Sequence, residues 1–266
     1  MTGERPADVD RGRGFTYGTQ TRVHPQDTEV SVVPSRFTGV ASQLVNLVFD
    51  SALPRDLAGF WEGLFSWDAP FQPAFRSEAV PKRGKNRLHL DLTSRSPGHQ
   101  AELVDRALSL GARHIDIGQG PPAEKRVPWV VLADPEGNEF CVLEPREQYE
   151  GSGAIASVVT DALDPERLAR FWAAALGWEI GVREKTIVGL RPPGGRGPWV
   201  EFLATKEEKQ HKNRLRFEIA PRRGKSRTAE VRRLRELGAT GQGSARQGAV
   251  AMVDPEGNEF SVLAPR

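Results

Sequence analysis

His89 and Asp91 are the pair of side chains in this sequence whose types and spacing best suit proton transfer. They stand two residues apart in the stretch LHLDL at 88–92, and alternate residues of a strand point to the same side. The leucines therefore predict a core face, and the imidazole and the carboxylate share the opposite one. A carboxylate that fixes the tautomer of an imidazole suits a general base or a ligand-contacting histidine. The competing interpretation is a structural histidine that hydrogen-bonds Asp91 or Glu139.

Cys141 and the tryptophans are the next candidates for contact with a ligand. Cys141 is the only cysteine in the sequence, which rules out an internal disulfide and a multi-cysteine metal site. No His or Lys adjoins it to lower its pKa, so we expect a small buried packing residue. Four of the six tryptophans recur at matched positions of an internal repeat and are expected in the core. Trp129 and Trp199 have no such counterparts and are better candidates for the wall of a ligand site.

A seven-residue stretch, DPEGNEF, occurs twice, at 134–140 and at 254–260. Asp, Pro and Gly at its first, second and fourth positions are typical of a type I turn, so each copy predicts a chain reversal between two strands. The strand that leaves the first turn alternates, which places Phe140 on the core face and Glu139 and Cys141 on the other. The chain is therefore expected to contain two copies of one module.

The elements around these turns also repeat in order. Phe60-Trp61 returns as Phe171-Trp172, 111 positions later, and the stretch at 85–88 returns at 212–215, 127 positions later. The second module therefore has 16 additional residues, enough for a hairpin at 179–190 and a strand at 199–204 that the first module abbreviates. The linker at 67–83 contains three prolines and shows no clear strand. Residue types and periodicity predict further strands at 44–50, 87–92, 113–117 and 155–161, and helices at 55–65, 97–110, 165–176 and 226–237.

Length and composition indicate a globular protein. The 266 residues, 38% of them hydrophobic, suffice for a real core. Residues 1–43 are rich in Gly, Pro, Thr, Arg and Asp and predict a flexible arm, with a short docked strand between Phe15 and Val33 as the alternative. No apolar stretch reaches the roughly 20 residues of a membrane helix, and the N-terminus is polar. We therefore expect a cytoplasmic protein without a membrane partner.

The net charge of +2 conceals a difference between the two halves. Residues 44–150 hold 12 Lys or Arg against 16 Asp or Glu, whereas residues 151–266 hold 20 against 14. Twelve basic residues fall between Lys206 and Arg235, which we interpret as a solvated helix face with loops. Interleaved aromatic residues are almost absent and no nucleic-acid motif occurs, so no nucleic-acid partner is expected. An anionic small ligand is the alternative, with Arg216 as its contact.

These motifs together resemble the vicinal oxygen chelate superfamily, which includes glyoxalase I, extradiol dioxygenases and bleomycin-resistance proteins. The resemblance rests on the tandem modules, the Phe-Trp pair in the first helix, the Leu-Gly-Trp helix end at 176–178 and the Asp-Pro-Glu-Gly hairpin. More narrowly, 85–92 and 134–143 resemble glyoxalase-like proteins of high-GC bacteria. The implied fold is α+β: βαβββ-type modules at 44–150 and 151–266, each with a curved mixed sheet backed by two helices, paired around one or two concave clefts.

The resemblance also maps the superfamily's metal-ligand positions onto this chain. They come from the first strand of a module, from its last strand and, in some branches, from its third strand. A divalent ion usually needs three or four converging ligands, and only His89 is of a usual type, so neither a metal site nor a cofactor is expected. The mapped positions hold Asn46 and Ser157, Cys141 and Ser261, and His89 and Arg216.

Two functions of different class remain open, because this fold hosts binding proteins as well as enzymes. The first is a sequestering binder of a planar or anionic organic molecule, which contacts the mapped positions together with Asp91, Glu139 and Glu218. The second is a lyase, isomerase or oxygenase that uses His89 with Asp91 or Glu139. The swap of His89 for Arg216 predicts unequal clefts, with an anion preferring Arg216 unless Glu218 neutralises it. A monomer or a homodimer is expected.

Overall fold

The computed structural model describes residues 41–78, 81–118, 127–244 and 248–266. They belong to one compact unit, Ser35–Arg266. The predicted N-terminal arm lies outside the described residues except for its last three positions, as does the loop at 119–126. No helix in the described ranges is long and apolar enough to span a membrane.

Sheet A is a mixed sheet of six strands in the spatial order β12-β13-β14-β11-β1-β2. Strands β1 and β11 are antiparallel neighbours, and β2 runs parallel to β1. The strands are β1 (Gln43–Ser51), β2 (Gln72–Ser77), β11 (Leu215–Ala220), β12 (Thr240–Ser244), β13 (Val250–Val253) and β14 (Glu259–Val262).

Sheet B has eight strands in the order β4-β5-β6-β3-β7-β10-β9-β8. Here β3 and β7 form the central antiparallel pair, and β10 runs parallel to β7. The strands are β3 (Leu88–Leu92), β4 (Arg113–His114), β5 (Val130–Ala133), β6 (Glu139–Val142), β7 (Ile155–Ala162), β8 (Glu179–Arg183), β9 (Ile187–Arg191) and β10 (Trp199–Ala204).

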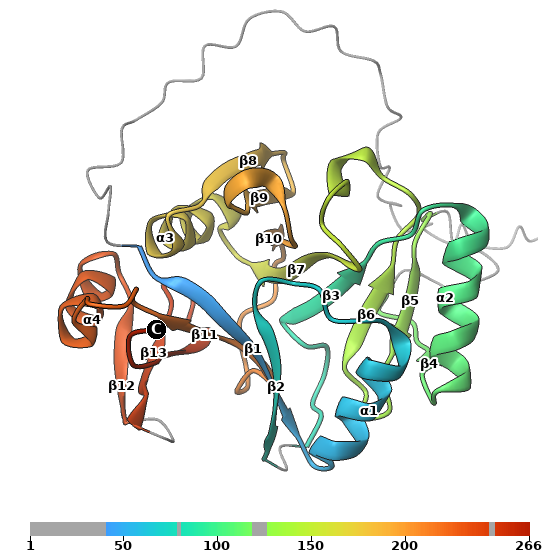
Figure 1. Ribbon diagram of the computed structural model, residues 1–266, viewed down its shortest axis with the longest axis horizontal. Helices are drawn as coiled ribbons and strands as arrows, with labels where there is room; N and C mark the ends of the chain where they lie inside the picture. Colours follow the sequence, from blue (N-terminus) through green and yellow to red (C-terminus); the bar gives the residue numbers. More distant parts are fainter. Residues whose placement is uncertain (1–40, 79–80, 119–126, 245–247) are drawn as a thin grey trace, which may run out of the picture. The chain divides into compact units, whose positions relative to one another are not determined.

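Each sheet is assembled from halves of both modules. Sheet A joins β1 and β2 of the first module to β11–β14 of the second, and sheet B joins β3–β6 to β7–β10. In Figure 1 the blue strand β1 accordingly lies between the teal β2 and the orange-red β11. The expectation that each module carries its own sheet is therefore wrong, because the alternation of residues specifies a strand's faces but not its partners.

The two sheets follow one plan. Strands β1, β2, β11 and β14 of sheet A correspond to β7, β10, β3 and β6 of sheet B, so the repeated turns occupy equivalent positions. Sheet B alone continues beyond this plan, because β8 and β9 lie outside β10. These strands use the additional residues of the second module, as predicted.

Strand β2 lies in the linker that was predicted to have no strand, and that prediction is wrong. β2 pairs in parallel with β1 at the edge of sheet A, and its residues are exposed or half-buried. Proline is tolerated at an edge because its missing N–H can face away from the neighbouring strand. The prolines of the linker are therefore compatible with an edge strand, although they argued against a strand in the sequence.

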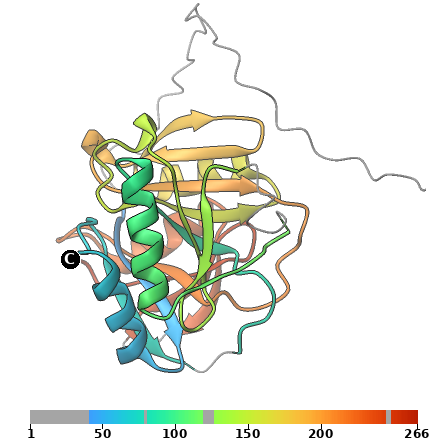
Figure 2. The same ribbon diagram turned by 90° about the vertical axis from the view of Figure 1, so that its right-hand side faces the viewer.

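Four helices of the described residues pack on the sheets: α1 (Pro54–Leu64), α2 (Pro97–Ser109), α3 (Pro165–Leu176) and α4 (Arg227–Glu236). Figures 1 and 2 both show α1 and α2 side by side. Trp61 of α1 packs on Phe140 with ring centroids 5.1 Å apart, and Trp172 of α3 packs on Phe260 at 5.2 Å. The four recurring tryptophans lie in the main core or pack against it, as predicted.

The repeated turn is held by its first aspartate. Asp134 accepts hydrogen bonds from the backbone N–H of Glu136 and Asn138, and Asp254 does the same in the second copy. Gly137 N–H donates to the Asp134 carbonyl at 2.9 Å, which confirms the predicted reversal. Its φ of 85° lies in the left-handed region, where glycine is favoured.

The glutamate of each turn ties the two modules together. Glu136 accepts backbone N–H groups at the start of α1 and forms an ion pair with Arg214 of the second module at 2.7 Å. Glu256 accepts the N–H groups at the start of α3 and pairs with Arg87 of the first module at 3.0 Å. A carboxylate is favourable at a helix N-terminus. The glutamate therefore has the same role in both copies of the turn.

Candidate functional site

Face B is the side of sheet B opposite the main core, and it gathers buried polar side chains. His89 and Asp91 point there, because the leucines of β3 occupy the core. Cys141 of β6 lies beside Asp91 in register, and Ser157 of β7 lies opposite it. Glu201 of β10 faces the same side one strand further out. Four of the five are buried, and the Asp91 side chain is 13% exposed.

His89, Asp91 and Cys141 form one cluster whose polar atoms lie within 4.8 Å of one another. His89 Nε2 is 3.5 Å from Asp91 Oδ1, and the Cys141 thiol hydrogen-bonds the Asp91 carboxyl group. Burial, and then the charge of Lys85, lowers the pKa of His89 to about 3. Burial, and then the charge of Glu201, raises the pKa of Asp91 to about 7. Asp91 is therefore the member that exchanges a proton near neutral pH.

Glu201 is held by neutral donors from the segment that links the modules. The Tyr149 hydroxyl lies 3.1 Å from each carboxyl oxygen, and Gln148 Nε2 donates to Oε1 at 3.1 Å. The buried Ser157 hydroxyl has no hydrogen-bond partner among the described residues. Burial raises the pKa of Glu201 above its ordinary value. Burial, and then the charge of Glu201, raises the pKa of Tyr149 well above its ordinary range.

A second apolar cluster surrounds these polar groups, and it contains both tryptophans that lack a counterpart in the repeat. A Cβ atom at Gly181 of β8 would lie 2.8 Å from the Trp199 ring, so the hairpin that only the second module has supports this ring closely. The role of Trp129 and Trp199 as a ligand wall stays a prediction. The cluster consists of Ile115, Ile117, Trp129, Val131, Cys141, Leu143, Tyr149, Ala156, Val182 and Trp199.

Arg146 lies at the edge of the same cluster. Its guanidinium carbon is 5.6 Å from the centroid of Trp129, and its Nε donates to Glu144 at 2.6 Å. Its side chain is 31% exposed. A pocket of about 580 Å³ is lined by Arg146 and Tyr149 together with Thr93, Gly151 and neighbouring residues. Space is therefore present beside Tyr149.

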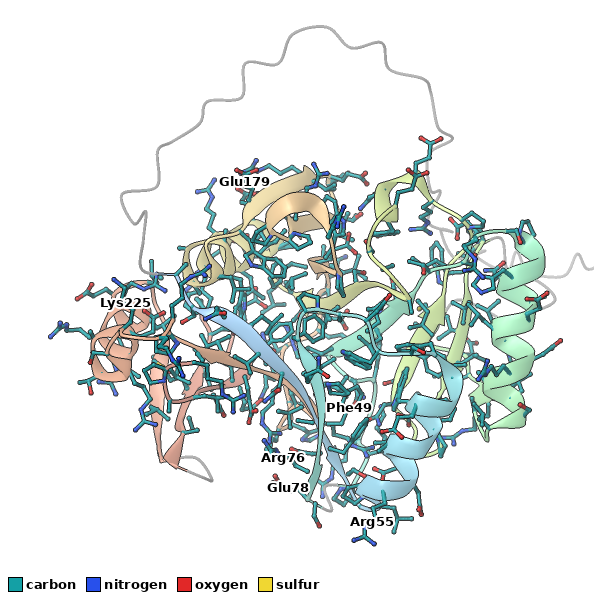
Figure 3. All side chains as sticks on the ribbon, viewed as in Figure 1. Phe49, Arg55, Arg76, Glu78, Glu179 and Lys225 are labelled. Carbon is teal, nitrogen blue, oxygen red and sulfur yellow. The ribbon has the colours of Figure 1, made fainter. Side chains whose placement is uncertain are left out.

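Face A, the equivalent side of sheet A, carries Asn46, Glu218 and Ser261. Asn46 Nδ2 donates to Glu218 at 2.5 Å, and Arg76 of β2 pairs with the same carboxylate at 3.4 Å. Figure 3 labels Arg76 near the end of β2. Ser261 stands beside Glu218 in register. Gln72, the counterpart of Trp199, is exposed, so face A lacks the aromatic wall of face B at this position.

Arg216 pairs with Asp50 rather than with Glu218. Arg216 Nη1 lies 2.6 Å from Asp50 Oδ1, and Lys212 Nζ lies 2.9 Å from Asp50 Oδ2. The Asp50 side chain is fully buried, and that of Arg216 is 15% exposed. The preference of an anion for Arg216 stays a prediction, with Asp50 as the competing partner.

Glu139 has partners outside the cluster around His89. It accepts from Lys82 Nζ at 2.7 Å and from the backbone N–H of Asn86 at 3.2 Å. Glu259, its counterpart, is held in the same way by Lys209 and the backbone of residue 213. This repetition favours a structural role for Glu139, and Asp91 is the carboxylate that contacts His89.

The nitrogen, oxygen and sulfur donors of His89, Asp91 and Cys141 are of types that zinc accepts. However, Cys141 and Asp91 already hydrogen-bond each other. His89 Nδ1 has no hydrogen-bond partner among the described residues, whereas a ligating histidine usually donates its second ring N–H to an acceptor. The cluster thus lacks the outer acceptor of a typical metal-ligating histidine, and the absence of a metal site stays a prediction.

Glu201, Tyr149 and Arg146 were not predicted as site residues. A usable signal existed for Glu201, because it interrupts an apolar strand on the same face as Trp199. Tyr149 ends a short 3₁₀ helix, Glu147–Tyr149, and its partner is 52 positions away in the sequence. Local sequence patterns carry no information on such a contact.

Paired βαβββ-type modules with two such faces define the vicinal oxygen chelate fold. A family model described as a glyoxalase-like domain matches residues 46–143 and 157–263. The chain therefore belongs to the glyoxalase-like family of the vicinal oxygen chelate superfamily. A comparison with curated proteins finds no match.

Solved structures share the fold at low sequence identity. Glyoxalase I from Zea mays is 14% identical, with 85% of this chain and 93% of that chain covered and a TM-score of 0.58. A candidate dioxygenase from Bacillus subtilis is 13% identical, with 84% of each chain covered and a TM-score of 0.54. At this identity the similarity shows the fold alone.

Proposed function

We propose that the protein binds a small planar organic molecule on face B, against Trp199 and the polar groups of Asp91 and Glu201. One observation carries the proposal: buried hydrogen-bonding groups lie inside an apolar cluster with two tryptophans. Ligand sites typically combine an apolar and aromatic lining with a few placed polar groups. Family membership supports binding or catalysis on a small molecule in general, and the contrast with face A favours face B.

The carboxyl groups on face B favour a neutral or cationic ligand over an anion. Asp91 and Glu201 are acceptors when ionised, and their mutual repulsion already disfavours a second negative charge. We therefore place the planar alternative above the anionic one. The ligand would donate hydrogen bonds to these carboxyl groups and stack on indole.

A thermal-shift screen of neutral and cationic heteroaromatic compounds, followed by tryptophan fluorescence titration, tests this function. Trp199→Phe is expected to weaken a hit about tenfold, because part of the stacked surface is lost. Glu218→Gln on face A is the matched control and should leave affinity unchanged. Equal losses in both variants would place the ligand elsewhere.

An enzyme that uses Asp91 and His89 is the second candidate, favoured by one observation. The two groups are 3.5 Å apart, and the pKa of Asp91 is raised to about 7. Such a carboxyl group can give or take a proton at neutral pH, as a lyase or an isomerase requires. The neutral imidazole would then donate or accept a hydrogen bond.

Solvent deuterium exchange into a bound hit distinguishes the two candidates. Asp91→Asn should abolish exchange and leave binding within about threefold if Asp91 transfers the proton. Unchanged exchange in this variant would exclude Asp91 as the proton donor, and absence of exchange in the wild type favours the binding protein. Metal analysis of the purified protein accompanies this test, because a stoichiometric ion lost in His89→Ala would overturn our assignment of the cluster.

A further inference from the structure

We propose that the ring of Tyr149 occupies a ligand subsite on face B, and that a ligand bearing a neutral hydroxyaryl or ring N–H group replaces Tyr149 at Glu201. This inference rests on the proposed function, because it takes face B as the ligand site. It adds the chemical class of the group bound at Glu201 and the residue that must leave.

The contact between Tyr149 and Glu201 has the form expected between a bound phenol and its acceptor. The hydroxyl is equidistant from both oxygens at 3.1 Å. Tyr149 is 7% exposed and Glu201 is 1% exposed, so the hydrogen bonds are shielded from water. The phenol ring packs in the cluster that contains Trp199. The phenol group of Tyr149 thus shows which kind of chemical group fits against Glu201.

Tyr149 ends a single 3₁₀ turn, Glu147–Tyr149, which reaches sheet B through the side-chain hydrogen bonds of Gln148 and Tyr149 to Glu201 and pairs with no strand of the described residues. Ser94 Oγ donates to the Leu143 carbonyl at 2.7 Å before it, and Thr93 Oγ1 donates to the Gly153 carbonyl at 2.7 Å after it. Gly151 and Gly153 both have a φ of 82°, a conformation suited to a sharp change of direction. Residues 144–150 can therefore shift without breaking a strand pair of sheet B.

The pocket of about 580 Å³ beside Tyr149 and Arg146 offers a place for the displaced ring. Pockets that take drug-sized ligands measure about 300–1,000 Å³. A single phenol ring is much smaller than such a ligand, so this pocket has room for it. Tyr149 can therefore leave Glu201 without entering the main core. The lining includes Thr93 and Arg95, whose side chains can hydrogen-bond a phenol hydroxyl.

The partners of Glu201 restrict the class of ligand. They are neutral donors: the hydroxyl of Tyr149 and the amide of Gln148. An apolar ring would remove the Tyr149 donor from a buried carboxyl group without replacing it, which is costly. A carboxylate or phosphate would bring a second negative charge. A planar ring with one O–H or N–H donor satisfies both conditions.

The test uses the full chain with Tyr149→Ala and the probe p-cresol, which is the side chain of tyrosine as a free molecule. Calorimetric titration is expected to show that the variant binds p-cresol at least about tenfold more tightly than the wild type. Toluene, which lacks the hydroxyl, should bind the variant at least about fivefold more weakly than p-cresol. Glu201→Leu in the same background should remove the difference between the two probes.

Circular dichroism first establishes that Tyr149→Ala is folded. The inference is overturned if the folded variant does not bind p-cresol, or if it binds toluene as tightly as p-cresol. If Tyr149→Ala does not fold, Tyr149→Phe replaces it: the phenyl ring lacks the hydroxyl and should yield to p-cresol several times more readily than tyrosine. An unchanged p-cresol affinity in Tyr149→Phe would then overturn the proposal. Failure of the ligand screen with successful p-cresol binding would instead reject the proposed function.

Discussion

His89 and Arg216 stand at the same strand position in the two sheets, yet their surroundings differ in kind. On face A, Arg216, Lys212 and Asp50 form a cluster of opposite charges, and Glu218 is paired with Arg76. On face B, His89 and Asp91 are buried groups whose pKa values shift toward the neutral forms. A paired set of charges fixes structure, whereas buried neutral donors and acceptors can still exchange partners.

The aromatic cover follows the same division. Trp199 and Tyr149 pack over face B, and the position of Trp199 is taken on face A by exposed Gln72. The difference depends on two additions to the repeat, the β8–β9 hairpin and the linking segment. The two faces share one strand plan, and these additions give face B an apolar and aromatic cover.

The largest expected effect is on stability, at face A. Arg216→Met keeps the volume of the side chain and removes one cation from the fully buried Asp50. Loss of a partner from a buried ion pair typically costs about 3–5 kcal/mol, and Lys212 should keep the loss near the lower end. His89→Gln at the equivalent position should cost about half as much. Guanidinium denaturation measures both.

Asp50→Asn combined with Arg216→Met is the control for this prediction. The two losses should be strongly non-additive, because each variant alone removes the same interaction. A stable Arg216→Met protein would show that Lys212 suffices for Asp50, and face A would then hold a cation available to an anionic ligand.

The next effect is the pH dependence of face B. Asp91, with its pKa raised from 3.8 to about 7, stabilises the fold at low pH and loses this contribution as the pH rises to about 7. His89, with its pKa lowered from 6.5 to about 3, contributes stability at high pH that is lost as the pH falls below 6.5. The two slopes oppose each other between pH 3.8 and 6.5.

Single variants should therefore expose these slopes. Relative to the wild type, the unfolding free energy of Asp91→Asn should rise with pH over this window, and that of His89→Gln should fall. One proton corresponds to about 1.4 kcal/mol per pH unit. Urea denaturation at half-unit intervals from pH 4 to 7 provides the measurement. Parallel curves for all three proteins would mean that face B is open to water.

The smallest effect compares the two repeated turns. Asp134 and Asp254 accept the same backbone hydrogen bonds, but only Asp254 also accepts Trp172 Nε1, at 3.2 Å. Trp61 Nε1, the equivalent donor, has no partner among the described residues. Asp254→Ala should therefore cost about 1 kcal/mol more than Asp134→Ala by chemical denaturation. The gap should close in a Trp172→Phe background.

Much of the fold was predictable because it depends on local sequence patterns. The alternation at 88–92 placed His89 and Asp91 on one face, and Pro165 correctly marked the start of α3. The identical turns revealed the repeat and hence the family. The partners of each strand were not predictable in this way, because pairing between β1 and β11 joins residues about 170 positions apart.

The candidate site was predicted only in part for the same reason. The positions of His89, Asp91, Cys141 and Ser157 follow from strand alternation and from the superfamily's strand positions. Asp50 as the partner of Arg216, and Tyr149 as the partner of Glu201, arise from packing between elements distant in sequence. The local pattern of residue types along the chain does not predict contacts between such distant residues.

The shared sheets have a consequence for how this chain can be divided. A module taken alone would contain β1 with β2 and β3 with β4–β6, and the inner edges of β1 and β3 would lack their strand partners. Unpaired inner edges favour association with another chain. The molecule is thus equivalent to a strand-swapped dimer whose two subunits are fused. Cleavage at the linking segment would give two complementary fragments. Each fragment would supply the strands that pair with the open edges of the other.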